Sequence, residues 1–177
     1  MTETIRTATE NDAGALARLA AVTFPLACPP GSSPEDIAAH LRGTLSAEKF
    51  AQYLADPDIT ILVIDGGEGL HGYSMLVYRP AQDPAVAAAL TLLPSAELSK
   101  CYVHPEHHGL GAAARLMTGT LERATTMGAA GVWLGVNSEN AKAIRFYEKS
   151  GFRKIGTKSF RLGTTLEHDF VMELAVR

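Results

Sequence analysis

The second half of the chain alternates expected strands and helices around a glycine-rich turn. Apolar residues at strand and helix periods predict strands over Glu97–Val103 and Gly131–Val136 and helices over Gly109–Met127 and Asn140–Ser150. A strand, a helix and a second strand at this spacing form a crossover that joins two parallel neighbours in one sheet. The chain must therefore build a sheet with a parallel pair of strands and with helices packed against it.

Antiparallel strands are expected on both sides of this parallel pair. The glycine-rich turn at residues 66–69 joins two apolar segments into an expected hairpin. The expected strands outside the crossover are Thr4–Ala8, Ile59–Asp65, Leu70–Arg79, Phe152–Phe160 and Leu166–Ala175. The fold class is therefore α+β, a mixed α/β arrangement with a central sheet of about seven strands and helices on both faces. At 177 residues the chain has the length of a single domain, covering residues 1–177.

The first half of the chain carries most of the expected helices and most of the negative charge. Capping residues and apolar spacing predict helices over Glu10–Ala21, Pro34–Arg42, Ala47–Ala55 and Pro84–Leu90, with a break rich in Pro, Gly and Ser at 25–34. Residues 1–100 contain twelve acidic and six basic residues, a charge of −6, and residues 101–177 contain seven and ten, a charge of +3. One half of the chain suits a cation and the other suits an anion.

Composition excludes several classes of protein. No apolar run approaches the roughly 20 residues that cross a bilayer, and residues 1–12 are too polar for a signal peptide, so we expect a cytoplasmic protein with no membrane partner. No basic stripe with interleaved aromatic residues indicates a nucleic-acid partner. Cys28 and Cys101 lack the spacing of a disulfide scaffold or a zinc site. His104, His107 and His108 have no carboxylate at ligand spacing in the sequence, and we expect no metal.

The glycine-rich turn before the long helix predicts a site for a phosphate anion. It reads His108-Gly109-Leu110-Gly111-Ala112-Ala113. Glycines let a ligand approach the backbone closely, and free N–H groups at a helix N-terminus favour negative charge. The phosphate loop of nucleotide hydrolases needs Gly-Lys-Ser/Thr, which this turn does not have. A dinucleotide fold has its glycines after the first strand, whereas these follow the fourth expected strand.

A second motif follows the next expected strand. It reads Asn140-Ala141-Lys142-Ala143-Ile144-Arg145-Phe146-Tyr147-Glu148-Lys149-Ser150-Gly151-Phe152. Together with the glycine turn, it resembles the two signature blocks of the GCN5-related N-acetyltransferases (GNAT). Shorter matches, among them Thr23-Phe24 and the closing strand Asp169–Met172, are similar to the bacterial Pai-type spermidine/spermine acetyltransferases of that family. The turn departs from the family at one position, because His108 stands where Gln or Arg is usual.

The resemblance implies that the cosubstrate is acetyl-CoA. In that family two parallel strands separate and admit the pantetheine arm, which maps to backbone contacts at Cys101, Tyr102 and Val103 that also polarise the thioester carbonyl. The diphosphate contacts map to His108, Gly109, Leu110, Gly111, Ala112 and Ala113. Asn140 positions the cofactor arm, and Lys149 contacts the 3′-phosphate. The acetyl-CoA-binding core then covers about residues 95–152, between acceptor-side helices at about 10–55 and a C-terminal hairpin at about 152–175.

The resemblance also implies direct transfer of the acetyl group to an amine. Tyr147 lies on one helix face with Asn140, two turns along, and its phenol suits protonation of the departing CoA thiolate. Glu97 is the expected base for the acceptor amine, directly or through water. Strict alternation along its strand places Glu97 on the face of Cys101 and Val103. Cys101 is expected to be a core residue rather than a nucleophile, because the amine attacks directly.

The expected acceptor is a small polyamine such as spermidine or spermine. This expectation combines the Pai-type resemblance with the acidic segment Glu35–Asp58, whose carboxylates attract protonated nitrogens. Two alternatives stay open, namely an acetyltransferase for a peptide or another small amine, and a non-catalytic module that senses acetyl-CoA. The assembly is expected to be a monomer or a homodimer.

Overall fold

The computed structural model describes residues 2–176, without the side chains of residues 160 and 162. Its strands form one seven-stranded sheet in the order β1-β2-β3-β4-β5-β7-β6. They are β1 (Thr4–Thr7), β2 (Ile59–Asp65), β3 (Leu70–Val77), β4 (Ser95–Val103), β5 (Gly131–Asn137), β6 (Arg153–Leu162) and β7 (Thr165–Ala175). Within the described residues, β4 and β5 are parallel and all other neighbours are antiparallel. The expected mixed sheet with one parallel crossover is confirmed.

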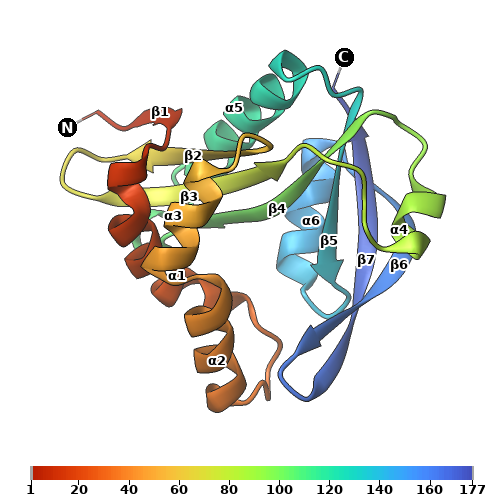
Figure 1. Ribbon diagram of the computed structural model, residues 1–177, viewed down its shortest axis with the longest axis horizontal. Helices are drawn as coiled ribbons and strands as arrows, with labels where there is room; N and C mark the ends of the chain where they lie inside the picture. Colours follow the sequence, from red (N-terminus) through yellow and green to blue (C-terminus); the bar gives the residue numbers. More distant parts are fainter. Residues whose placement is uncertain (1, 177) are drawn as a thin grey trace.

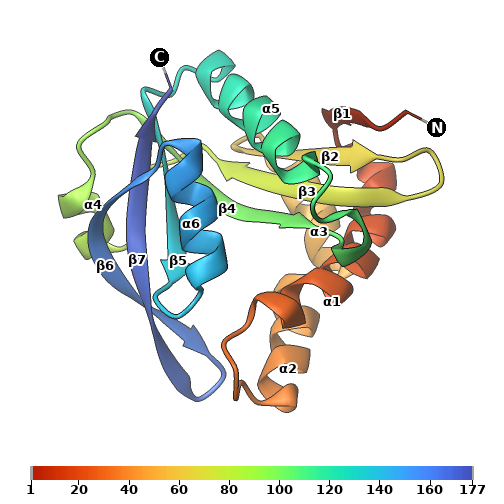
Figure 2. The same ribbon diagram turned by 180° about the vertical axis from the view of Figure 1, so that it is seen from behind.

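Helices cover both faces of this sheet (Figure 1 and Figure 2). One face carries α1 (Ala13–Ala27), α2 (Pro34–Thr44) and α3 (Ala47–Ala55), and the opposite face carries α5 (Ala112–Thr126) and α6 (Ala141–Ser150). The short helix α4 (Pro84–Ala89) packs near β6, and two 3₁₀ turns, η1 (Glu10–Asp12) and η2 (Pro105–His107), complete the set. Of residues 2–176, no helix is both long enough and apolar enough to cross a membrane.

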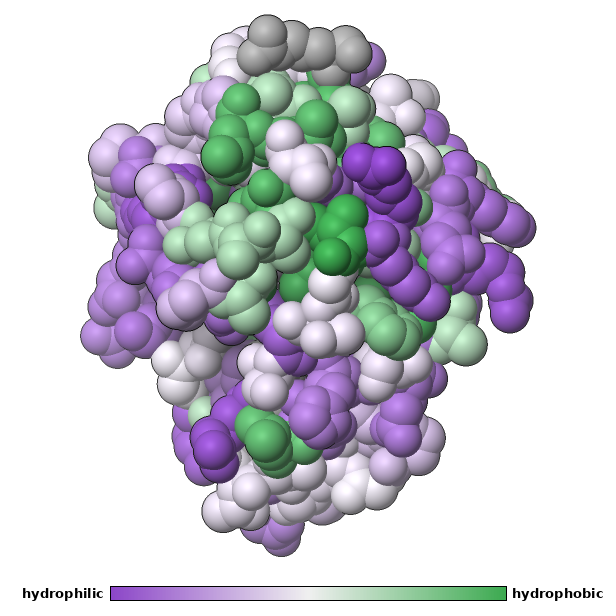
Figure 3. All heavy atoms as spheres, turned by 90° about the vertical axis from the view of Figure 1, so that its right-hand side faces the viewer, coloured by the Kyte–Doolittle hydropathy of each residue, from purple (hydrophilic) through white to green (hydrophobic). Residues whose placement is uncertain are grey.

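Each face of the sheet has its own apolar cluster. Under α1 and α3, Phe50 is fully buried and meets the ring of Tyr73 edge-on, with 5.7 Å between ring centroids. On the opposite face, α5 and α6 cover a second cluster, and under α4 a smaller one joins Val86 to Trp133. The surface on the α4 side shows apolar patches among charged residues (Figure 3). Burying each large side chain contributes about 1.5–3 kcal/mol, so the strands between these clusters are firmly held.

The helix α1 extends further than the sequence predicts. The expected end was Ala21, but the helix continues to Ala27 and includes Pro25 in its last turn. Tertiary packing explains the longer helix. Phe24 is buried against the sheet and stacks on His40 of α2, with 4.5 Å between ring centroids. The remaining helix and strand boundaries agree with the prediction to within three residues.

The parallel strands β4 and β5 are paired over a short distance only. Their paired residues are Ser95 with Gly131, Ala96 with Val132 and Glu97 with Trp133. Beyond Glu97, β4 continues to Val103 paired with β3, and β5 continues to Asn137 paired with β7. The sheet therefore divides into two halves that diverge (Figure 2). The edge of β4 over residues 98–103 faces the opening without a strand partner.

A β-bulge lies in β4 where the two strands begin to separate. The residues of β3 and β4 that flank it are paired Met75 with Lys100 and Leu76 with Leu98. Met75 and Leu76 are adjacent in β3, but their partners Lys100 and Leu98 are two residues apart in β4. Ser99, which lies between these partners, is left without a partner in β3. A bulge of this kind moves the alternation of side chains by one residue.

The bulge overturns the expected face of Glu97. Glu97 pairs with Val77, which packs in the cluster under α1 and α3, and paired residues of neighbouring strands share a face. Tyr102 packs in the same cluster, whereas Cys101 and Val103 pack under α5. The expectation that Glu97 lies on the face of Cys101 and Val103 is therefore wrong.

Candidate active site

The turn that follows β4 presents backbone rather than side chains. The helix α5 begins at Ala112, not at the expected Gly109, because Gly109 and Gly111 have φ of 80° and 76°. This left-handed region is one that glycine adopts without strain. A Cβ at Gly109 would meet nothing within 4 Å, so the loop is open there. The first N–H groups of α5 have no acceptor within the helix, and such a surface fits a diphosphate.

Two side chains brace this loop. The guanidinium of Arg115 donates to the carbonyl oxygen of Leu110 at 3.0 Å and to Oε2 of Glu3 at 2.5 Å. The Nε2 atom of His108 lies 2.7 Å from the carbonyl oxygen of Val103. Because a carbonyl oxygen only accepts, Nε2 carries the proton in this arrangement. The second ring nitrogen, Nδ1, then donates only when the ring is protonated.

The histidines beside the loop have an acidic neighbour that is distant in the sequence. Glu3 Oε1 lies 2.6 Å from Nδ1 of His71 and 3.8 Å from Nδ1 of His107. Of the three histidines considered in the sequence, His107 therefore has a carboxylate nearby that is distant along the chain, because the sheet brings the N-terminal segment beside the end of β4. The rings of His71 and His107 stack with 3.5 Å between centroids and 13° between planes. Ring lone pairs lie in the ring planes, so in this stacked geometry they do not converge on one ion.

Tyr147 of α6 faces the opening between β4 and β5. Its ring contacts those of Phe146 and Phe152, with 5.5 Å and 5.8 Å between centroids. Burial raises the pKa of Tyr147 well above its usual value, and the neighbouring Cys101 and Tyr102 of β4 raise it further. The phenol therefore keeps its proton at neutral pH and is a hydrogen-bond donor there.

The side chains of β4 beside the opening are also protonated. Burial raises the pKa of the Cys101 thiol to about 12, and burial likewise raises the pKa of Tyr102. Cys101 is thus a neutral thiol at physiological pH, whereas nucleophilic cysteines are thiolates. The next residue, Val103, is buried under α5.

Asn140 is the N-cap of α6 rather than its first residue. Its Oδ1 accepts from the backbone N–H of Ala143 at 3.1 Å, which leaves the amide Nδ2 available to a ligand. Asn140 lines a cavity of about 210 Å³ together with Leu26, Ala27, Cys28, Pro29, Pro30, Asn137 and Glu139. Lys149 lies in the last turn of α6 and is exposed.

Glu97 lines a second cavity, of about 270 Å³, on the other side of the opening. Its walls are Val77, Arg79, Pro80, Ala81, Gln82, Asp83, Glu97, Trp133 and Lys158. Burial raises the pKa of Glu97, although the charges of Lys100 and Lys158 oppose this shift. The indole N–H of Trp133 is buried and has no hydrogen-bond partner in the described part of the chain. A half-buried carboxyl with a raised pKa and an unpaired buried donor are typical of a ligand site.

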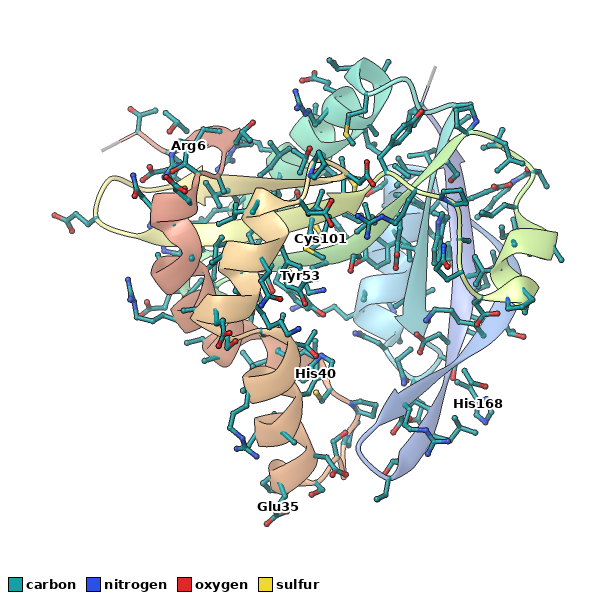
Figure 4. All side chains as sticks on the ribbon, viewed as in Figure 1. Arg6, Glu35, His40, Tyr53, Cys101 and His168 are labelled. Atoms are coloured by element: carbon teal, nitrogen blue, oxygen red, sulfur yellow. The ribbon has the colours of Figure 1, made fainter. Side chains whose placement is uncertain are left out.

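Lys100 is a charged residue of this region that the sequence analysis missed. It lies beside the bulge in β4, with Nζ 5.5 Å from the centroid of the Tyr53 ring of α3. Figure 4 labels Tyr53 on α3 and His40 on α2, which lie on the face of the sheet to which Lys100 belongs. Burial lowers the pKa of Lys100 to about 8, partly opposed by Glu97. A lysine three residues after Glu97 in the same expected strand was a signal available in the sequence.

The acidic residues of the first half are mostly engaged with other groups. Arg79 donates to Asp56 at 2.6 Å and to Asp58 at 3.3 Å, and Arg6 pairs with Asp65 at 2.9 Å. Glu35 is far out at the N-terminus of α2 (Figure 4) and accepts from the Ser33 hydroxyl at 2.8 Å. Fewer carboxylates of residues 35–58 are therefore available to an acceptor amine than the composition of this segment indicates.

Comparison with known proteins places this geometry in a family. Residues 27–152 match the acetyltransferase (GNAT) family. An uncharacterised N-acetyltransferase of Mycobacterium tuberculosis is 47% identical over 161 residues, covering 91% of this chain and 96% of that protein. One from Lactobacillus delbrueckii subsp. lactis is 28% identical over 149 residues, covering 82% of this chain and 81% of its own.

Solved structures share the fold over almost the whole chain. The PaiA N-acetyltransferase of Thermoplasma acidophilum, in complex with coenzyme A, superposes with a TM-score of 0.77 at 23% identity, covering 99% of both chains. The yncA protein of Salmonella typhimurium, with its cofactor acetyl-CoA, superposes with a TM-score of 0.65 at 24% identity, covering 100% of this chain and 95% of its own. The divided sheet, the left-handed glycine turn and these likenesses lead to one assignment. The chain belongs to the GNAT family of acetyltransferases and is an acetyl-CoA-dependent N-acetyltransferase.

Proposed function

We propose that the enzyme transfers the acetyl group of acetyl-CoA directly to a small cationic primary amine, in the opening between β4 and β5. The observation that carries the proposal is the early end of β4–β5 pairing at Glu97 and Trp133, beside a loop with open backbone donors. An extended pantetheine arm fits where a strand is missing, because the β4 edge over 98–103 has backbone groups without a strand partner. Cys101, Tyr102 and Val103 supply these contacts, and residues 108–113 hold the diphosphate.

Three side chains complete the proposed site. Asn140 positions the cofactor arm through the free amide at the start of α6, and Lys149 meets the 3′-phosphate from its exposed last turn. Tyr147 donates its proton to the departing thiolate. Its raised pKa means that the phenol is protonated at neutral pH, so that its O–H can donate a hydrogen bond to the sulfur.

The acceptor enters as an ammonium ion and must lose a proton before its nitrogen attacks. Glu97 is the proposed carboxylate for that proton, through an intervening group or water. The C–N bond then forms as the C–S bond breaks, and the sulfur takes the proton of Tyr147. Cys101 carries no acetyl group in this scheme, because its thiol is protonated.

The proposed acceptor is a polyamine such as spermidine or spermine. The negative charges beside the opening support a polyamine acceptor, and the acidic segment 35–58 is no longer needed for this proposal. Glu139 lines the cavity beside Cys28, and Glu167 accepts from Asn137 at 3.3 Å. Burial raises the pKa of Cys28, and the charge of Glu167 raises it further, so Glu167 acts on the same region. Asp169 is already paired with Lys158 at 3.5 Å, so Glu139 and Glu167 are the carboxylates proposed to attract an amine whose other nitrogens are protonated.

Acceptor preference should depend on salt. Spermidine contacts several carboxylates and a monoamine of similar length contacts one, each contact being worth about 0.2–1 kcal/mol and screened by ions. We expect kcat/KM for spermidine to exceed that for the monoamine by about 10-fold or more, with the gap shrinking between about 0.05 and 0.5 M salt. The double variant Glu139→Gln and Glu167→Gln should shrink it at low salt.

The matched control is the double variant Glu10→Gln and Glu122→Gln, which removes two negative charges from exposed positions on η1 and α5. Equal salt profiles for both amines would contradict the polyamine proposal and leave the acetyl transfer standing. The transfer itself is tested by free-thiol release from acetyl-CoA with a panel of amines, peptides included, and by the mass of each product. If no amine causes release of free thiol, the result would favour the alternative of a non-catalytic module that senses acetyl-CoA.

His108 provides a test of the diphosphate loop. Its Nε2 is engaged with the Val103 carbonyl, so only a protonated ring offers an Nδ1–H to the diphosphate. We expect His108→Asn to raise KM for acetyl-CoA, because the variant loses the ring that braces the loop against the Val103 carbonyl. An unchanged KM in a folded His108→Asn protein would mean that backbone N–H groups hold the diphosphate alone.

Location and assembly are proposed from the sequence alone. The composition predicts a cytoplasmic site of action, and the expectation of a monomer or homodimer stays a prediction.

A further inference from the structure

Lys100 is the titratable side chain closest to the bulge at which β4 leaves β5. The register of β3 places it after Ser99, on the face of Glu97 and Tyr102. Its backbone directly precedes that of Cys101, the first of the proposed contacts with the pantetheine arm. Lys100 thus lies on the acceptor side of the strand that holds the thioester.

The surroundings of Lys100 favour a neutral amine. Among residues 2–176, no carboxylate lies within 4.0 Å of Nζ, which donates to the Ser99 hydroxyl at 3.1 Å and lies 5.5 Å from the centroid of the Tyr53 ring. The other titratable groups that face it are Glu97 of β4 and His40 of α2. A buried ammonium without an ion-pair partner loses hydration that nothing replaces. The resulting pKa of about 8 leaves a sizeable neutral fraction at physiological pH.

We propose that Lys100 is the group that takes the proton from the acceptor ammonium, with Glu97 stabilising the lysine ammonium that forms. This inference rests on the proposed function and makes Lys100, instead of Glu97, the base that takes the proton. Lysine is suited to the task, since its protonation state shifts readily on burial. A neutral Lys100 also removes the repulsion that a second cation would exert on a cationic acceptor.

The proton count balances without any further reactant. The acceptor R–NH₃⁺ gives one proton to neutral Nζ of Lys100, which becomes an ammonium beside the Glu97 carboxylate. The freed lone pair forms the C–N bond while the C–S bond breaks. The nitrogen loses a second proton as the amide forms, and this proton replaces, through solvent, the one that Tyr147 gives to the sulfur. Lys100 releases its proton to solvent, so each turnover liberates one proton.

The test compares pH profiles of kcat/KM for the acceptor in wild type, Lys100→Arg and Lys100→Met. We expect the wild type to show an inflection near pH 8. Both variants should lose this inflection and fall by about 10²-fold or more, because arginine never deprotonates and methionine accepts no proton. The affinity for acetyl-CoA, measured by calorimetry, should change by less than about threefold in a variant whose thermal unfolding matches the wild type.

A second variant separates Lys100 from Glu97. The charge of Glu97 raises the pKa of Lys100, so Glu97→Gln should move the inflection to lower pH without removing it. Loss of the inflection in Glu97→Gln, with retention in Lys100→Met, would assign the base to Glu97 and overturn the inference. Activity of Lys100→Arg equal to the wild type would also overturn it, because a permanent charge would then suffice.

Failure of this inference is distinct from failure of the proposed function. If the wild type releases CoA and forms an acetylated amine while the Lys100 variants behave like it, the proton path alone is wrong. If the wild type acetylates no amine, the proposed function fails before the variants are compared.

Discussion

Replacing Gly111 by valine is expected to weaken acetyl-CoA binding by about 10² to 10³-fold, or roughly 3–4 kcal/mol. Gly111 is the N-cap of α5 at φ of 76°, and a β-branched residue does not adopt this conformation without strain. The valine would either occupy the space of the diphosphate or turn the backbone N–H groups away from it. Calorimetry with acetyl-CoA measures the loss directly.

The same φ angle predicts a stability cost of about 1–2 kcal/mol in this variant. Gly67→Val is the matched control, because Gly67 has φ of 87° but lies in the β2–β3 turn, away from the loop. Gly67→Val should lose similar stability in thermal unfolding and keep its affinity for acetyl-CoA. Unchanged affinity in a folded Gly111→Val protein would remove the loop from the cofactor site.

Replacing Tyr147 by phenylalanine is expected to lower kcat by about 10 to 10³-fold while the affinity for acetyl-CoA stays nearly the same. The variant keeps the ring that packs on Phe146 and Phe152 and removes only the hydroxyl. The departing thiolate then has no positioned donor. Steady-state kinetics with saturating acceptor, combined with calorimetry, separates chemistry from binding.

The control for this change is Tyr78→Phe, which removes a phenol from the edge of the cluster under α5 and α6. It should leave kcat within about twofold of the wild type. An unchanged kcat in Tyr147→Phe would mean that solvent or another group protonates the thiolate, and that Tyr147 has a packing role.

The parts of the site that the sequence predicts well are those built from contiguous residues. The glycine turn before α5 and the block from Asn140 to Phe152, which contains α6, are each one continuous segment. Local chemistry therefore specifies them: left-handed glycines lead into α5, and an asparagine caps α6.

The parts that the sequence does not predict depend on pairing between distant segments. The bulge at Ser99 is visible only in the register between β3 and β4, and it alone decides that Glu97 and Lys100 share a face. The contact between Glu3 and Arg115 joins residues 112 positions apart. Periodicity within one segment carries no information about either.

Most sheets have two free edges, at their outermost strands, but this sheet has a third one in its interior. Free edges are hazardous because they recruit further strands from other chains. Here the interior edge of β4 is flanked by α6 and by the diverging β5, so a full strand with its own side chains does not fit easily, while a slender thread such as pantetheine does. The division of the sheet thereby gives the protein backbone hydrogen bonding for its cosubstrate without an exposed template for aggregation.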